Sequence, residues 1–107
     1  MLHYNVWFNL KSGVPEESGL SVVREYLSAL ADAGEANGFT LLKNLGNPPR
    51  SKLPCFHALI EFNDSESLGV AMKKQDERGI HTGKHGKIVE MVCDFHVEIF
   101  TGIPTPD

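Results

Sequence analysis

The stretch VCDFHVEIF, from Val92 to Phe100, alternates between two kinds of side chain along its whole length. The apolar positions are Cys93, Phe95, Val97 and Ile99. The positions between them are Asp94, His96 and Glu98, closed by Phe100. Strict alternation predicts a β-strand with two different faces. The apolar face belongs in a core, while the other face is either an ordinary solvated surface or the wall of a site.

Working outward from this stretch, the chain shows three more strand-like segments. Alternating apolar residues predict strands at about 2–10, 39–45 and 55–62. The prolines of the segment between the second and third strands predict a loop there, because proline excludes regular structure. Cys93 is expected to face the helices and Cys55 the opposite side, so an internal disulfide is not expected.

Two amphipathic helices separate these strands. Pro15 is expected at the first helical position of a helix that runs to about Ala36, with Gly38 near its stop. Asn63 and Glu66 resemble a capping box at the start of the second helix, and the glycine at 79 ends it. The glycine-rich segment GKHGK at 83–87 is expected to be a solvated loop, with anion binding as the alternative.

The order strand, helix, strand, strand, helix, strand predicts a ferredoxin-like α+β fold. We expect a single domain over residues 1–107, with residues 102–107 as a C-terminal tail. Its four-stranded antiparallel sheet carries both helices on one face. Right-handed crossovers place the first strand between the third and the fourth.

Composition excludes several classes of protein. The chain has 107 residues and a formal net charge of −4, without a basic stripe, which argues against nucleic-acid binding. No apolar run approaches the roughly 18 residues that a membrane helix needs, and the N-terminus lacks the features of a signal peptide. Two cysteines, both expected as free thiols, suit a reducing compartment, so a cytoplasmic location is predicted.

One face of the predicted sheet is left uncovered by the helices, and its composition is mixed. It is expected to hold His3, Asn5, Trp7, Asn9, His57, Leu59, Glu61, Asp94, His96, Glu98 and Phe100. Trp7, Leu59 and Phe100 would form an apolar patch that is costly to expose. We therefore expect a second copy to pack face to face, giving a homodimeric barrel with a polar-lined cavity. The alternative is a monomer with a solvated sheet.

Three segments carry a resemblance to a known family. HYNVWFNLKSGVPEE, HALIEFNDSESL and VEMVCDFHVEI resemble the first strand, the third strand with the following helix start, and the last strand of the stress-responsive α/β-barrel proteins. The resemblance extends from about Leu2 to Phe100. It implies the dimeric α/β-barrel fold, in a group that includes cofactor-independent monooxygenases, isomerases, cyclases, haem-handling proteins and members without assigned chemistry.

The resemblance also implies site residues. His3 matches an early histidine of the family pattern. In the cyclase-like members, a histidine after the second helix serves as the acid–base residue. His81 is the better match to that histidine, with His85 in reserve.

The predicted strands also suggest how the histidines are grouped. With the third strand running in the direction of the first, and the fourth opposite to it, His3, His57 and Glu98 are expected near one end of the uncovered face. Such a group suits three uses: a divalent metal site, a general acid–base pair, or hydrogen bonding inside a dimer cavity. His57 and His96 are expected to be the most perturbed titrating groups.

We therefore expect a cytoplasmic homodimer whose cavity binds a small organic molecule without a cofactor. One hypothesis is an isomerase, cyclase or oxygenase-like enzyme, with His57, His96 and His81 as candidate catalytic residues. A non-catalytic stress-response or ligand-binding module is the second hypothesis. A metal site built from His3, His57 and Glu98 is the third.

Overall fold

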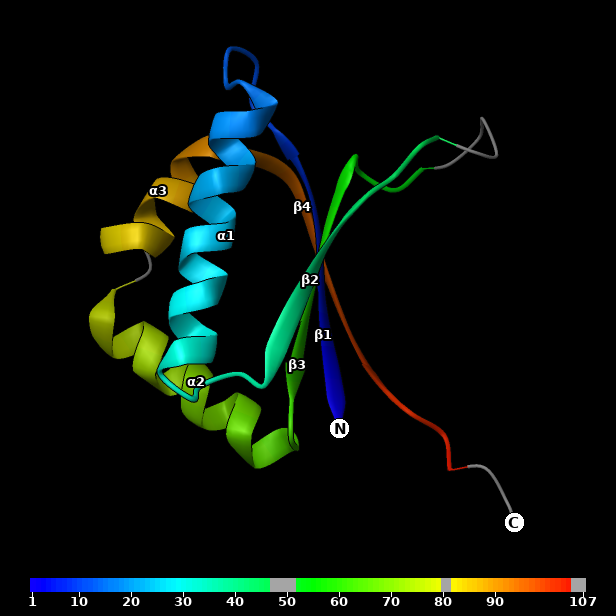
Figure 1. Ribbon diagram of the computed structural model, residues 1–107, viewed down its shortest axis with the longest axis vertical. Helices are drawn as coiled ribbons and strands as arrows, with labels where there is room; N and C mark the ends of the chain where they lie inside the picture. Colours follow the sequence, from blue (N-terminus) through cyan, green and yellow to red (C-terminus); the bar gives the residue numbers. More distant parts are fainter. Residues whose placement is uncertain (47–51, 80–81, 105–107) are drawn as a thin grey trace.

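The computed structural model describes residues 1–46, 52–79 and 82–104. The strands are β1 (Leu2–Leu10), β2 (Gly38–Lys43), β3 (Phe56–Phe62) and β4 (Val92–Thr101). The helices are α1 (Glu16–Asp32), α2 (Ser65–Arg78) and α3 (Gly83–Met91). All three helices lie on the same side of the sheet (Figure 1).

The four strands form one antiparallel sheet in the order β2-β3-β1-β4. The predicted ferredoxin-like arrangement is therefore confirmed, with a third helix added before β4. The expected direction of the third strand is wrong, because β1 and β3 are antiparallel and Trp7 pairs with His57. The crossover through α1 makes β2 run in the direction of β1, and β3 pairs antiparallel with β2, so β3 also opposes β1.

Helix α1 is shorter than its periodicity predicts. Pro15 is the N-cap residue, not the first helical residue, and the helix ends at Asp32 instead of near Ala36. Gly34 adopts a positive φ of 74°, so the chain leaves the helix there, before Gly38. A residue without Cβ takes this left-handed conformation at little cost.

Helix α2 begins one residue later than the capping box suggests. Asp64 is its N-cap, and the Asp64 carboxylate accepts a hydrogen bond from the backbone N–H of Ser67 at 2.8 Å. This bond lowers the pKa of Asp64, because it stabilises the ionised carboxylate. Gly79 ends the helix with a φ of 94°, as predicted.

The glycine-rich segment that the sequence suggested as a loop is helix α3. Glycine costs about 1 kcal/mol in a helix interior relative to alanine, so local propensity argues against this helix. Gly86 is nevertheless buried, and α3 packs beside α1. Tertiary packing therefore overrides the local preference of the segment.

The start of β4 contains an irregularity that the alternating pattern did not predict. Trp7 pairs with His96, but Asn9 pairs with Cys93, so one extra residue is inserted in β4. Asp94 occupies this bulge with a φ of 54°. Because a bulge shifts the alternation by one residue, Cys93 shares the face of Asn9 and does not face the helices as expected.

The core lies between the sheet and the helices. Its buried members are Phe8, Val23, Leu27, Leu30, Ala36, Phe56, Ala58, Ile60, Phe62 and Leu68. Most of them come from β1 and β3 and from the inner faces of α1 and α2, as the periodicity predicts, while Ala36 lies between α1 and β2. Within the described part of the chain, no helix is both long and apolar enough to cross a membrane.

Candidate functional site

The open face of the sheet carries an aromatic row made of three side chains from three strands. Trp7 lies between His57 on β3 and His96 on β4, which are its pairing partners. The indole stacks on the His57 ring with centroids 4.5 Å apart and planes at 21°. The His96 ring is tilted, with its centroid 5.8 Å from the indole. Two of the predicted catalytic histidines therefore flank one tryptophan.

Asn5 fixes the protonation pattern of His57. Its side chain is buried, with only 4% of the residue exposed. The Asn5 amide nitrogen donates to the carbonyl oxygen of His3 at 3.0 Å, and its oxygen lies 2.7 Å from His57 Nε2. Nε2 must then carry the proton, which leaves a lone pair on Nδ1. Burial lowers the pKa of His57, so the imidazole is held in its neutral form.

His96 is tied to the carboxylate of Glu98 on the same strand. The two side chains meet at 2.9 Å, and both are about half exposed, at 52% and 50%. A pair this open to water contributes little to stability. Asp94, another predicted cavity residue on β4, accepts a hydrogen bond from Asn9 at 2.9 Å and is exposed.

The grouping of His3, His57 and Glu98 does not form. The antiparallel register places His3 beside Glu61 and Phe100. His57 pairs with Trp7, which lies four residues further along β1 than His3. Glu98 pairs with Asn5. Among the described residues, no three histidine, cysteine, aspartate or glutamate side chains gather as metal ligands would. The strand direction assumed from the sequence was the source of the error.

The other residues predicted for the open face differ in how exposed they are. Leu59 and His3 are half-buried, while 54% of Phe100 is exposed. His81 lies outside the described residues, as does the end of the predicted tail. In the single chain, the open face is thus a surface and not an enclosed cavity.

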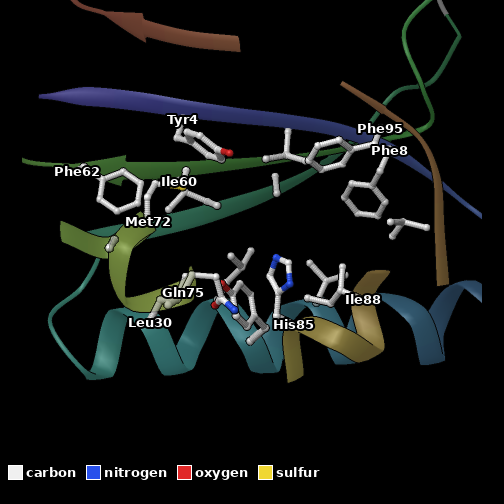
Figure 2. Close-up of a pocket in the computed structure, with 17 residues that line it drawn as sticks. Tyr4, Phe8, Leu30, Ile60, Phe62, Met72, Gln75, His85, Ile88 and Phe95 are labelled. Atoms are coloured by element: carbon white, nitrogen blue, oxygen red, sulfur yellow. The ribbon is translucent and has the colours of Figure 1, made fainter. Parts of the chain in front are cut away.

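A second candidate site lies on the opposite face of the sheet, between the strands and the helices (Figure 2). This inner cavity has a volume of about 160 Å³ and is lined by 17 residues, most of them aliphatic or aromatic. Strand residues such as Tyr4, Ile60 and Phe62 face helix residues such as Leu30 and Ile88 across it. Its apolar walls suit a small organic molecule.

Three polar groups from the three helices meet in the inner cavity. The Tyr26 hydroxyl of α1 donates to the Gln75 side-chain oxygen of α2 at 2.8 Å. The His85 ring of α3 approaches the Tyr26 ring edge-on, with centroids 5.4 Å apart. Burial raises the pKa of Tyr26 to about 12, and the neighbouring Arg78 charge only partly offsets this effect. The phenol is therefore a neutral hydrogen-bond donor at physiological pH.

Sequence reasoning named His85 only in reserve and missed Tyr26 and Gln75. The signal for Tyr26 was present, since it lies at helical spacing among Val23, Leu27 and Leu30 and must share their inward face. The signal for His85 was hidden, because its segment reads as a loop until helix α3 is known.

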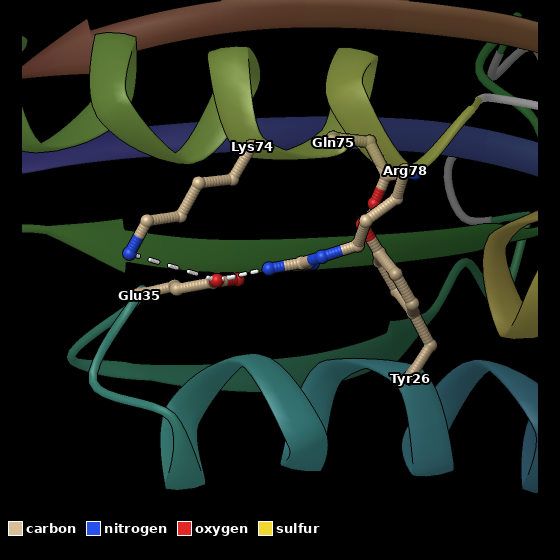
Figure 3. Close-up of polar contacts among 5 residues, drawn as sticks. All are labelled: Tyr26, Glu35, Lys74, Gln75 and Arg78. Carbon is tan, nitrogen blue, oxygen red and sulfur yellow. Dashed lines mark hydrogen bonds and ion pairs between the residues drawn. The ribbon is translucent and has the colours of Figure 1, made fainter.

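An outer cavity of about 350 Å³ adjoins the inner one and shares Tyr26, Leu30, Gln75 and His85 with it. Its other walls include Glu35, Arg78 and Lys84. The Glu35 carboxylate is almost fully buried and accepts a hydrogen bond from Arg78, with the Lys74 ammonium 4.0 Å away (Figure 3). This hydrogen bond raises the pKa of Arg78.

Comparison with known proteins finds a matching family and several structures with a similar fold. A family profile described as "Family of unknown function (DUF6614)" matches residues 1–107. No curated protein matches the sequence significantly. Protein At3g17210 from Arabidopsis thaliana has a similar structure, with a TM-score of 0.75 and 10% identity over 99% of each chain.

Two bacterial structures extend this comparison. A dimeric ferredoxin-like protein of unknown function from Thermobifida fusca has a TM-score of 0.65 and 17% identity, covering 92% of this chain and 88% of its own. A DABB family protein with a ferredoxin-like fold from Mesorhizobium loti has a TM-score of 0.63 and 16% identity, covering 96% and 97%. The resemblance to the ferredoxin-like α/β-barrel group is confirmed at the level of the fold.

Proposed function

We propose that this chain, which belongs to the family of unknown function DUF6614, binds a small organic molecule in its inner cavity and catalyses proton transfer on it. The observation that carries the proposal is the meeting of Tyr26, Gln75 and His85 in a cavity whose other walls are mainly apolar. An apolar cavity with a few converging polar groups is the usual form of a small-molecule site.

The three polar groups suit different roles. Histidine both accepts and donates a proton near neutral pH, so His85 is the candidate acid–base residue. Tyr26 stays protonated because burial raises its pKa to about 12, and it is a hydrogen-bond donor for a carbonyl oxygen. Gln75 holds that hydroxyl at 2.8 Å until a ligand oxygen replaces it. This arrangement supports proton abstraction next to a carbonyl group, without a cofactor.

The reaction can be tested before the substrate is known. The ketone 4-phenylbutan-2-one places a phenyl ring in the apolar cavity and carries exchangeable protons next to its carbonyl group. In deuterated buffer, the wild-type protein should accelerate deuterium incorporation, measured by proton NMR. His85→Asn should reduce the acceleration by at least about a hundredfold, because general acid–base catalysis contributes that much.

His57→Gln is the matched control, since it removes a histidine from the open face and should leave the exchange unchanged. A wild-type protein that binds the ketone without accelerating exchange would be a ligand-binding module. Equal loss in both histidine variants would place the chemistry outside the inner cavity.

We also propose that a second copy of the chain covers the open face of the sheet. Leu42 and Phe100 are 46% and 54% exposed there, beside the half-buried Trp7 and Leu59. Apolar patches of this kind favour an interface. The similar protein from Thermobifida fusca is described as dimeric, which supports the pairing.

A cytoplasmic location belongs to the same proposal. Cys55 and Cys93 are both free in the structure. Unbridged cysteines suit a reducing compartment.

A further inference from the structure

We infer that the ligand of the inner cavity is an organic anion, whose charged group binds in the outer cavity at Arg78 and Lys84. This inference rests on the proposed function, because it names the class of molecule that the inner cavity takes. Its basis is the continuity of the two cavities, which share Tyr26, Leu30, Gln75 and His85. A molecule with an apolar body in the inner cavity would therefore extend its other end into the outer one.

The charges around the outer cavity favour an anion. Two lining residues, Arg78 and Lys84, are cationic, and Glu35 is the one carboxylate among the described lining residues. The net charge of the outer cavity's lining is therefore positive, although the whole chain carries a formal net charge of −4. An acidic protein with a cationic cavity mouth attracts anionic ligands to that mouth.

Arg78 is held in a position to bind a carboxylate. Its guanidinium donates to Glu35, whose side chain is only 6% exposed, while the Arg78 side chain is 48% exposed. A guanidinium has five N–H donors, and among the described residues Arg78 uses them on Glu35 alone. Arg78, Tyr26 and Gln75 line the same outer cavity, and the Arg78 side chain reaches from α2 towards Glu35 (Figure 3), so a ligand leaving the inner cavity would arrive beside it.

The experiment compares two ligands that differ in charge and share the same body. A cavity near 150 Å³ accommodates benzene, so 3-phenylpropanoate and 3-phenylpropan-1-ol both fit the inner cavity with their phenyl ring. Affinities are measured by titration with amide NMR spectra. The wild-type protein should bind the carboxylate at least about tenfold more tightly than the alcohol, as expected for charge-assisted hydrogen bonds.

Three variants test whether Arg78 and Lys84 bind the carboxylate of the ligand. Arg78→Gln should remove the preference and leave the affinity for the alcohol unchanged. Lys84→Gln should reduce the preference for the carboxylate by about threefold. Because Lys84 is exposed, this variant should fold, and it tests the anion inference if Arg78→Gln does not fold. Lys73→Gln removes the same charge from an exposed position of α2 outside both cavities, and its preference should equal that of the wild type.

The outcomes separate the two proposals. Equal binding of both ligands by the wild type, or an undiminished preference in Arg78→Gln and Lys84→Gln, overturns the anion inference and leaves the proposed function standing. Failure of both ligands to bind overturns the proposed function, and the inference fails with it.

Discussion

The two faces of the sheet are built from alternate residues of the same strands, yet they gather different chemistry. On the helix side, the strands supply mainly apolar walls such as Phe8, Ile60 and Phe62, and the helices supply Tyr26, Gln75 and His85. On the open side, the strands themselves supply the polar groups, including Asn5 and His57.

This difference shows which feature of the fold brings the polar groups of each site together. The polar groups of the open face depend on strand register, because neighbouring strands bring side chains together in rows. The polar groups of the inner cavity depend on how three helices dock. Burial also acts differently on the two faces: it raises the pKa of Tyr26 in the cavity and lowers that of His57 on the open face, and in both cases it favours the neutral form.

The largest expected effect is a difference in stability between matched substitutions on the two faces of the sheet. Phe62 on the covered face is 4% exposed, while Phe100 on the open face is 54% exposed. Phe62→Ala should lower the free energy of unfolding by about 3–5 kcal/mol, because it leaves a void in the core. Phe100→Ala, the matched change, should alter it by no more than about 0.5 kcal/mol in dilute protein. Urea denaturation measures both, and equal losses would contradict the assignment of the core to one face.

The next effect concerns association. Trp7→Asp places a charge in the centre of the proposed interface, where burial without a partner is costly. We expect the dimer to weaken by at least about a hundredfold, giving monomer in sedimentation velocity at micromolar concentration. Trp7→Phe keeps an aromatic ring and should remain dimeric. A dimer that survives Trp7→Asp with native stability would place the interface elsewhere.

The smallest effect is a pH dependence carried by His57. Its pKa is lowered by burial from the ordinary value of 6.5, so the folded protein takes up this proton less readily than the unfolded chain. Above about pH 6.5 the contribution to stability is fully present, and it is lost as the pH falls from there through the folded pKa.

The contribution is isolated by comparing the wild type with His57→Gln in urea denaturation between pH 7.5 and 5. All other titrating groups are shared by the two proteins, so only the difference between their curves belongs to His57. The wild type should lose more stability than the variant on acidification. Parallel curves would mean that His57 is not desolvated by Trp7 and Asn5.

Much of the fold could be predicted from local patterns. Alternation marked β1 over its exact bounds and β3 within one residue, because a sheet with one covered face requires apolar residues at every second position. The same rule misplaced Cys93, since a bulge with Asp94 at a positive φ shifts the alternation and leaves no clear mark in the residues themselves.

The candidate site was predicted only in part. His57, Trp7 and His96 were correctly assigned to one face, but only the antiparallel register showed that Trp7 lies between the two histidines. His85 was a reserve candidate because helix α3 opposes the helix propensity of its glycines. Nothing in the spacing of Gln75 along its helix indicated a hydrogen bond to Tyr26.

By itself, the sequence determined the alternation and helical periods, and with them the order of the strands and main helices and the uneven composition of the two sheet faces. These features follow from the hydrophobic effect acting on neighbouring residues, so they can be read locally. The tertiary structure alone decided the strand direction, the bulge, helix α3 and the meeting of Tyr26, Gln75 and His85. Those features depend on contacts between residues far apart in the chain, whose energies no local pattern records.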